Sequence, residues 1–248
     1  MSVQVRPPVL GKIPAFLKGL RSEKIMMNKI LKSIKPIFSK LNVIHKEDKL
    51  EAAISEYSEA IKHNPDYADL YFKRGGLYPY SKYENSNYDL AITDFNKALE
   101  IDPNHVDAYF WCAEFYSERG DFDLAIADLS KVIEIDPRYV NAYRRRSHIY
   151  CYKGEYDLAI ADLSKAIEFE PKFVDYYNRF FIFREKGEYD LAIADLSKAI
   201  KIDPKHVNAY FWRSKLYEKK GQYDLAIADF NFGTAIVIRE DCDANIYR

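Results

Sequence analysis

Charged side chains recur at equivalent positions along this chain. The recurring residues are Arg74, Arg146, Arg179 and Arg213, together with Asp94, Asp162, Asp195 and Asp229. A row of guanidinium groups on one surface could bind anions such as phosphates or carboxylates. The same residues could instead pair with one another and serve the architecture. Both interpretations are open, and the regular recurrence favours structural pairing.

Other residues with reactive side chains show no spacing that is typical of a catalytic or metal site. The five histidines are His45, His63, His105, His148 and His206, and the three cysteines are Cys112, Cys151 and Cys242. They form no HxxxH or CxxC pair, and the chain has no GxSxG, GxGxxG or GxxxxGK[ST] motif. We therefore predict no catalytic residue, no metal site, no cofactor and no enzymatic activity.

An internal repeat in the sequence indicates the secondary-structure elements that carry these residues. The segment GEYDLAIADLSKAI occurs twice, from Gly154 to Ile167 and from Gly187 to Ile200. Related segments end in a proline, and these prolines are 38, 34, 34 and 33 residues apart: Pro65, Pro103, Pro137, Pro171 and Pro204. A fixed period in this range indicates an array of stacked structural repeats.

Each period predicts two helices. In one copy the apolar residues follow helical spacing and form one stripe: Tyr156, Ala159, Ile160, Leu163, Ala166 and Ile167. A second amphipathic helix fills the segment between each proline and the next glycine, as in VDAYFWCAEFYSERG. Because one such hairpin cannot bury its apolar face alone, we expect neighbouring hairpins to stack.

These residues resemble the tetratricopeptide repeat (TPR) family. In that family the first helix of each repeat, helix A, carries an aromatic residue, a small residue and a second aromatic. Helix B carries alanine, a large apolar residue, a second small residue and a final proline. The second full repeat shows these positions as Tyr109, Ala113, Tyr116, Ala125, Leu129, Val132 and Pro137. The resemblance implies an all-α fold, a right-handed α-solenoid of stacked antiparallel helix pairs.

On this basis the chain divides into three parts. A basic leader spans residues 1–46, the solenoid spans 47–238, and a tail spans 239–248. The solenoid holds a degenerate repeat that ends at residue 65 and five full repeats at 67–103, 105–137, 139–171, 172–204 and 206–238.

Three features depart from the family pattern. The first full repeat carries an insertion at Pro79–Asn87. Phe180 occupies the small-residue position of the fourth repeat, where a large ring overpacks the helix crossing and predicts a local distortion of the superhelix. The last repeat lacks the final proline, has Gly233 at a position that is usually alanine, and is followed by no capping helix.

The resemblance places a binding surface on the outward positions of helix A, which line the concave face in that family. Trp, Tyr and Arg are common anchors of binding surfaces. The predicted binding residues are Phe72, Lys73, Phe110, Trp111, Glu114, Arg144, Arg145, His148, Tyr177, Asn178, Phe181, Arg184, Phe211, Trp212 and Lys215. Some of these rings could instead pack beneath neighbouring helices.

One TPR subtype grips the C-terminal carboxylate of its partner with lysines, asparagines and an arginine. Arg144, His148 and Asn178 partly match that pattern. Trp212 stands where the closing arginine belongs, and Asn208 stands where a lysine belongs. We therefore predict that this clamp is absent.

The leader and the body carry opposite charge. Residues 1–46 hold ten Lys/Arg and one acidic residue, a balance of +9, whereas the rest holds 27 basic and 37 acidic residues, a balance of −10. Residues 24–41 have the pattern of a basic amphipathic helix. Such a segment could cap the solenoid, bind an anionic membrane surface, direct the chain to an organelle or remain disordered.

The function that follows is a non-enzymatic scaffold that holds a protein or peptide on the concave face. Alternatives are a membrane-tethered adaptor and a homo-oligomer formed through the uncapped C-terminal repeat. RNA binding is a further alternative, and the acidic body argues against it. The odd cysteine count and the lack of a long apolar run predict a cytoplasmic location.

Overall fold

The computed structural model describes residues 46–80 and 87–246, and within these ranges the chain is helical and has no strand. The chain divides into two compact units, Met1–Lys49 and Leu50–Arg248. The interpretations of the leader, including the helix at 24–41, lie outside the described residues. Most of the Pro79–Asn87 insertion does too. The description below concerns the second unit.

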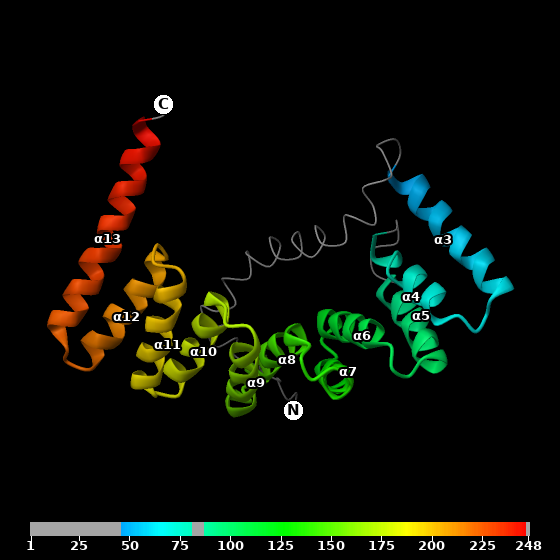
Figure 1. Cartoon of the computed structure of the whole chain (residues 1–248), viewed down its shortest axis with the longest axis horizontal. Coiled ribbons are helices and arrows are strands. Elements are labelled where there is room, and N and C mark those ends of the chain that lie inside the picture. Colours follow the sequence, from blue (N-terminus) through cyan, green and yellow to red (C-terminus); the bar gives the residue numbers. More distant parts are fainter. Residues whose placement is uncertain (1–45, 81–86, 247–248) are drawn as a thin grey trace, which may run out of the picture. The chain divides into compact units, whose positions relative to one another are not determined.

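The helices follow one another along the chain with short connections (Figure 1). A 3-10 helix, η2, spans Tyr78–Tyr80. The α-helices within the described ranges are α3 (Lys46–His63), α4 (Ala68–Gly75), α5 (Asn87–Ile101), α6 (Val106–Arg119), α7 (Phe122–Ile135), α8 (Val140–Lys153), α9 (Tyr156–Phe169), α10 (Phe173–Glu185), α11 (Tyr189–Ile202), α12 (Val207–Lys219) and α13 (Tyr223–Ile246).

The helices form hairpins that stack in chain order, which is the all-α solenoid that the sequence predicts. Helix A and helix B of each full repeat are α4 and α5, α6 and α7, α8 and α9, α10 and α11, and α12 and α13. These pairs make the most extensive contacts, and each helix B also contacts the helix A that follows it. The apolar face of each hairpin is therefore buried both within and between repeats.

Small side chains let the two helices of a hairpin approach closely. The recurring alanines Ala91, Ala125, Ala159 and Ala192 are fully buried on helix B. On α4 the facing residue is Gly75, where an added Cβ would lie 2.8 Å from Cε1 of Phe95. The positions of small side chains in the sequence therefore set the distance between the two helices of a hairpin.

The helix ends follow the predicted turn residues. α5, α7, α9 and α11 each end two residues before the proline of their repeat. Gly120 and Gly154 close α6 and α8 in the left-handed conformation, with φ of 86° and 78°. A side chain with a Cβ would be strained at this φ, which explains why glycine stands there.

The last helix runs further than the repeat predicts. α13 continues to Ile246, so most of the segment expected to be a separate tail at 239–248 belongs to this helix. The other copies end at an Asp-Pro or Glu-Pro pair, and this copy has Val237–Ile238 at that place. Because no proline stops the backbone hydrogen bonds, the helix propagates.

Candidate functional site

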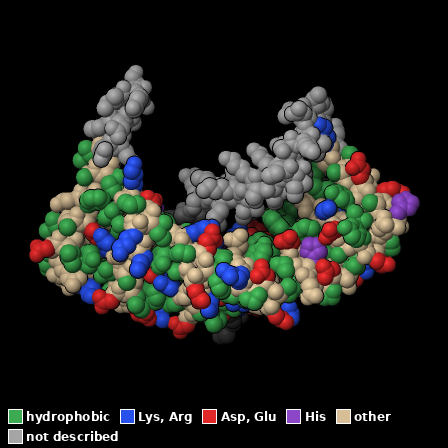
Figure 2. Space-filling view, viewed as in Figure 1, with side chains coloured by type: hydrophobic (Ala, Val, Ile, Leu, Met, Phe, Trp, Pro, Cys, Tyr) green, Lys and Arg blue, Asp and Glu red, His purple; other side chains and the backbone are tan. Residues whose placement is uncertain are grey.

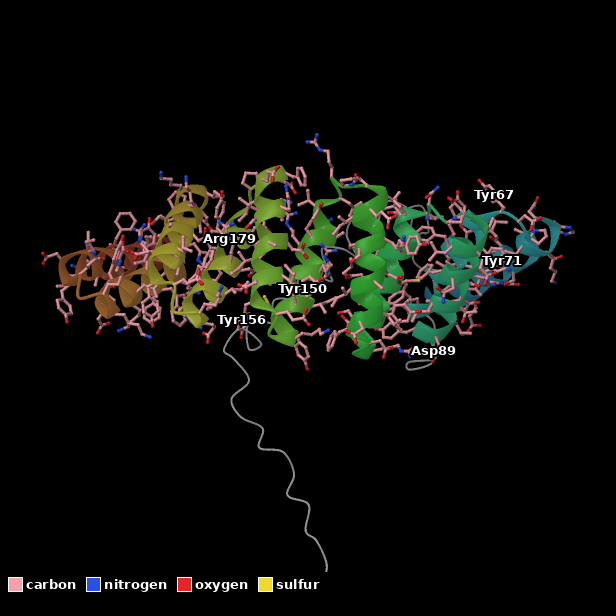
Figure 3. All side chains as sticks on the ribbon, turned by 90° about the horizontal axis from the view of Figure 1, so that it is seen from below. Tyr67, Tyr71, Asp89, Tyr150, Tyr156 and Arg179 are labelled. Carbon is pink, nitrogen blue, oxygen red and sulfur yellow. The ribbon has the colours of Figure 1, made fainter. Side chains whose placement is uncertain are left out.

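The recurring arginines pair with the recurring aspartates, which confirms the structural interpretation of this pattern. Arg179 of α10, which Figure 3 labels, donates from Nε and Nη2 to both carboxylate oxygens of Asp195, at 2.8 and 2.7 Å. Its Nη1 donates to Ser164 Oγ at 2.7 Å. One guanidinium therefore joins three helices, α9, α10 and α11, across the boundary between two repeats.

The same arrangement is found in three other repeats. Its members are Arg74 with Asp94 and Ser58, Arg146 with Asp162 and Ser130, and Arg213 with Asp229 and Ser197. In each case the hydrogen bonds to the aspartate raise the pKa of the arginine, so the guanidinium stays charged. These guanidinium groups are already hydrogen-bonded to aspartate and serine side chains of the chain, so the anion-binding interpretation does not apply to them.

The predicted binding residues of α4 and α6 differ in exposure. Lys73 is exposed, and Phe72 is half-buried with its ring 4.7 Å from the ring of His105. Trp111 is half-buried against Phe110. Phe110 itself is buried in the core that α6, α7 and α8 share, so it does not lie at the outward position expected for it.

The charged residues predicted on α6 and α8 form ion pairs with one another and with α10. Arg145 contacts Glu114 at 2.7 Å. Arg144 donates to both carboxylate oxygens of the buried Asp175, at 2.8 and 2.9 Å, and to the Glu170 carboxylate at 3.0 Å. Arg144 therefore holds α8 to α10, an architectural role that sequence reasoning missed.

His148 lies one turn further along α8. Burial and the neighbouring Arg145 lower the pKa of His148, so the neutral imidazole is favoured at physiological pH.

The predicted residues of α10 and α12 converge on one aromatic cluster. The rings of Phe181 and Trp212 meet edge to face at 5.7 Å, and Tyr177 contacts Phe181 at 5.2 Å. The guanidinium of Arg184 lies 4.6 Å from the Trp212 ring centre and 4.8 Å from that of Phe181. Burial raises the pKa of Tyr177 to about 12.

The edge of this cluster reaches the surface. Phe211 is 40% exposed, and its ring stands edge-on to Trp212 at 5.5 Å. Lys215, one turn further along α12, is exposed and pairs with Glu218 at 2.8 Å. Asn178 is half-buried on α10. Among the predicted residues, those of α10 and α12 therefore form a continuous aromatic surface; we call Tyr177, Phe181, Arg184, Phe211 and Trp212 the aromatic surface.

Figure 2 shows how charge is distributed on one face of the molecule. Lysine and arginine side chains gather over α11 and α12, whereas acidic and basic side chains alternate over the middle repeats. A ligand that contacts the C-terminal repeats would therefore meet a more positive potential there than over the middle repeats.

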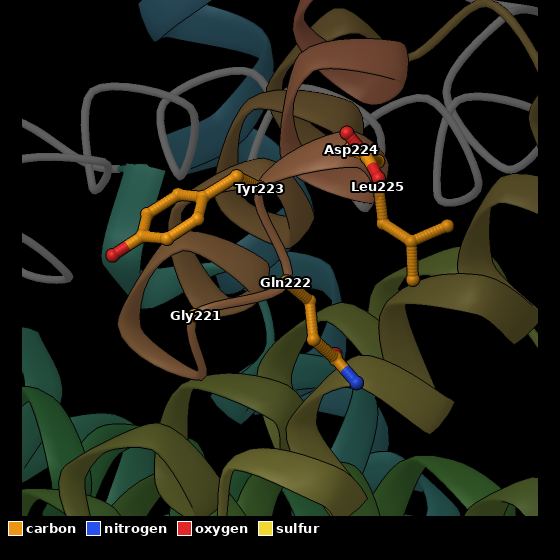
Figure 4. A pocket seen from close by; sticks show the side chains of 5 residues that line it. All are labelled: Gly221, Gln222, Tyr223, Asp224 and Leu225. Atoms are coloured by element: carbon orange, nitrogen blue, oxygen red, sulfur yellow. The ribbon is translucent and has the colours of Figure 1, made fainter.

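The depression at the α12–α13 turn is a poor candidate for a ligand site. It is lined by consecutive residues of one turn, Gly221 to Leu225, and no side chain from another repeat closes it (Figure 4). Binding pockets in proteins usually bring together groups from several elements.

In residues 46–80 and 87–246 no three His, Cys, Asp or Glu side chains are grouped so that they could hold a metal ion. None of the helices in the same ranges has the length and apolar character needed to span a membrane.

Stacked helix hairpins with an aromatic surface on one face define a class, the helical-repeat proteins. Comparison with known proteins narrows this class. A TPR-repeat family model matches residues 42–78, 148–179 and 182–221, and a second tetratricopeptide-repeat model matches 82–145. The chain belongs to the tetratricopeptide-repeat family.

Solved structures of the same fold agree. A crystal structure of MamA is 28% identical and covers 63% of this chain and 92% of its own, with a TM-score of 0.58. YrrB, described as a TPR protein with an unusual peptide-binding site, is 18% identical, covers 73% of this chain and 91% of its own, and has a TM-score of 0.61. No curated protein matches the sequence at a significant level.

Proposed function

We propose that this protein is a non-enzymatic scaffold that binds a peptide segment of a partner on the helix A surface of its C-terminal repeats. The observation that carries the proposal is the aromatic surface, in which Phe211 is exposed beside Trp212 and Arg184. An exposed ring next to a rigid aromatic and an arginine is the composition of a binding hot spot. Phe110, at the same position of the second repeat, is buried in the core, whereas Phe211 is 40% exposed.

The family and one structural relative support this proposal. TPR repeats are generally interaction modules, and YrrB is a TPR protein with a peptide-binding site. At 18% identity that likeness concerns the fold, so the location of the site on this chain is argued from its own residues.

The contacts of the aromatic surface indicate what it would bind. Arg184 lies against the rings of Phe181 and Trp212, and the Phe181 ring contacts those of Tyr177 and Trp212, so these side chains are already ordered. A ligand therefore loses little free energy in ordering them. We expect an extended peptide to place an aliphatic or aromatic side chain against Phe211 and Trp212.

The test is a selection from a random peptide library, followed by affinity measurements on purified chain. Trp111 and Trp212 are the two tryptophans, so a Trp111→Phe background leaves Trp212 fluorescence as a reporter of the surface. We expect selected peptides to shift this fluorescence saturably. Phe211→Ser should weaken their binding at least tenfold, because it removes the exposed ring from the surface. A factor of ten corresponds to about 1.4 kcal/mol of binding free energy.

A matched control is Leu191→Ala, which removes an exposed apolar side chain from helix B of the neighbouring repeat. It should leave the affinity unchanged. If Leu191→Ala and Phe211→Ser bind the selected peptides equally well, or if selection yields no peptide that shifts Trp212, the proposed surface is wrong.

A second candidate function, self-assembly, is favoured by one observation. On α13 the side chains of Ile227 and Phe230 are 58% and 56% exposed, whereas Leu196, the α11 equivalent of Phe230, is fully buried in the core shared with α12. Repeat arrays with an uncovered apolar end can stack on one another.

Contact of the leader with an anionic membrane and a cytoplasmic location stay predictions.

A further inference from the structure

The second full repeat breaks the arginine pattern. Cys112 stands on α6 where α4, α8, α10 and α12 carry Arg74, Arg146, Arg179 and Arg213. It is fully buried. The aspartate of this repeat, Asp128, is retained on α7, and Asn96 of α5 stands where other repeats have serine. The repeat has therefore lost the cation while keeping the residues that surround it.

The four arginine repeats show what surrounds that cation. Besides the aspartate and the serine, each guanidinium lies against an aromatic ring of its own helix A. Arg213 lies 5.7 Å from the ring centre of Tyr210 and 6.0 Å from that of Tyr217. The site is thus a carboxylate with bidentate geometry, a second oxygen acceptor and flanking aromatic faces, a combination suited to a guanidinium.

The second repeat retains this set. Tyr109 and Tyr116 flank Cys112 at the spacing of Tyr210 and Tyr217 around Arg213. The thiol of Cys112 lies 3.9 Å from Asn96 Oδ1. We call Asn96, Tyr109, Cys112, Tyr116 and Asp128 the Cys112 site.

Asp128 and Asn96 of this site reach solvent, although Cys112 itself is fully buried. Asp94, Asp162, Asp195 and Asp229 are buried beneath their arginines, whereas Asp128 is half-buried. Asn96 is exposed, and it lines a surface depression that extends to Arg74 and Asp94. Among the described residues Asp128 has no hydrogen-bond or ion-pair partner. Burial without a cation raises the pKa of Asp128 to about 7.

We propose that the Cys112 site binds a guanidinium group supplied from outside the chain. Asp128 accepts two of its N–H groups, Asn96 Oδ1 accepts a third, and the rings of Tyr109 and Tyr116 flank its plane. Compared with arginine, Cys112 lacks Cδ, Nε, Cζ and the two Nη atoms. Methylguanidinium consists of the same heavy atoms, so it is the minimal ligand. None of these residues belongs to the aromatic surface, so this inference stands apart from the proposed function.

The test is an NMR titration of the full isotope-labelled chain with methylguanidinium, with methylammonium at equal ionic strength as the control cation. We expect saturable shifts at Asn96, Cys112 and Asp128 with methylguanidinium and weaker effects with methylammonium, which cannot make the planar contacts. Cys112→Ser keeps the site empty and should bind as the wild type does.

Two variants make the proposal falsifiable. Cys112→Arg places a guanidinium in the site from within the chain, so it should abolish the titration and raise the midpoint of thermal unfolding. Asp128→Asn should abolish the titration without that rise. The proposal is overturned if methylguanidinium produces no saturable shift in the wild type, or if Cys112→Arg responds as the wild type does.

A second titration identifies which kind of molecule supplies the guanidinium. A blocked tripeptide with a central arginine is titrated beside methylguanidinium. If the tripeptide binds at least as tightly, a partner's arginine side chain is the ligand that fits. If methylguanidinium binds and the tripeptide does not, a free guanidinium compound fits instead.

Discussion

At the scale of single residues, the same arginine acts as a structural part in four repeats and is missing in one. The buried pair of Arg179 and Asp195 has its hydrogen-bonding groups largely satisfied by residues of neighbouring helices. A buried ion pair contributes little net stability, but removing one partner leaves a costly buried charge. This asymmetry leads to the first prediction.

We expect Asp195→Ala to lower the free energy of unfolding by roughly 3–5 kcal/mol, because Arg179 is left without its carboxylate. Urea unfolding followed by circular dichroism measures the change. The matched control is Asp190→Ala on the same helix, whose side chain is 84% exposed and pairs with Lys220. Its cost should stay within about 1 kcal/mol. Equal costs for the two variants would contradict the structural role of the buried pair.

The second prediction concerns pH and Asp128. Its pKa is about 7 in the folded chain, against 3.8 for the unperturbed group. The folded state therefore binds the proton more tightly, and the stability that the proton supplies is lost as pH rises from about 4 through 7. Cys112 and Tyr116 carry no charge at these pH values, and burial raises the pKa of each.

We expect the wild type to lose ~1–3 kcal/mol relative to Asp128→Asn between pH 4 and pH 8, because one pKa unit corresponds to 1.36 kcal/mol and partial exposure reduces the full effect. Urea unfolding of both proteins across this range gives the difference. Asp123→Asn, on the exposed face of the same helix, should leave the pH profile unchanged. A constant difference between wild type and Asp128→Asn would refute the raised pKa.

At the scale of helices, the fourth repeat shows how one large residue is accommodated. Phe180 takes the position that holds Gly75, Ala113, Ser147 or Ser214 in the other repeats. It is fully buried in a cluster with Leu196 and contacts the ring of Phe181 at 4.1 Å. The ring is therefore part of the core that links α10, α11 and α12, and the expected local distortion of the superhelix stays a prediction.

The third prediction tests the balance between packing and crowding at this position. Phe180→Ser restores the residue type of the neighbouring repeats. We expect it to lower the free energy of unfolding by about 3 kcal/mol, since loss of a buried ring costs more than relief of crowding returns. The reciprocal variant Ser147→Phe, in the third repeat, should also destabilise. A more stable Phe180→Ser protein would mean that crowding dominates.

At the scale of the whole array, neighbouring repeats bury one another's apolar faces, but Ile227 and Phe230 on the last described helix, α13, stay exposed. We expect sedimentation velocity to show self-association that increases with concentration. Phe230→Glu should reduce it, because a carboxylate would have to be desolvated at the contact.

The control for this prediction is Leu158→Glu, a charge at an exposed helix B residue of an interior repeat. It should leave the association unchanged. A wild type that sediments as a monomer at all concentrations would show that the uncovered end of α13 does not support assembly.

Much of this molecule could be predicted from the sequence. The repeat period, the alternating small and large apolar residues and the prolines determine the helices and their order. They also led to the pairing of Arg179 with Asp195. These features are local or recur in each copy, so a linear pattern is enough to show them.

Only the tertiary structure decided which predicted binding residues are accessible. Outward positions of helix A look alike in sequence, but Phe110 is covered by α8, Arg144 is bound by Asp175 from α10, and Phe211 stays exposed. The missing arginine at Cys112 is visible in the sequence, yet the solvent exposure of Asp128 and Asn96 beside it is not. Burial is the sum of contacts from three consecutive helices, and no single repeat contains that information.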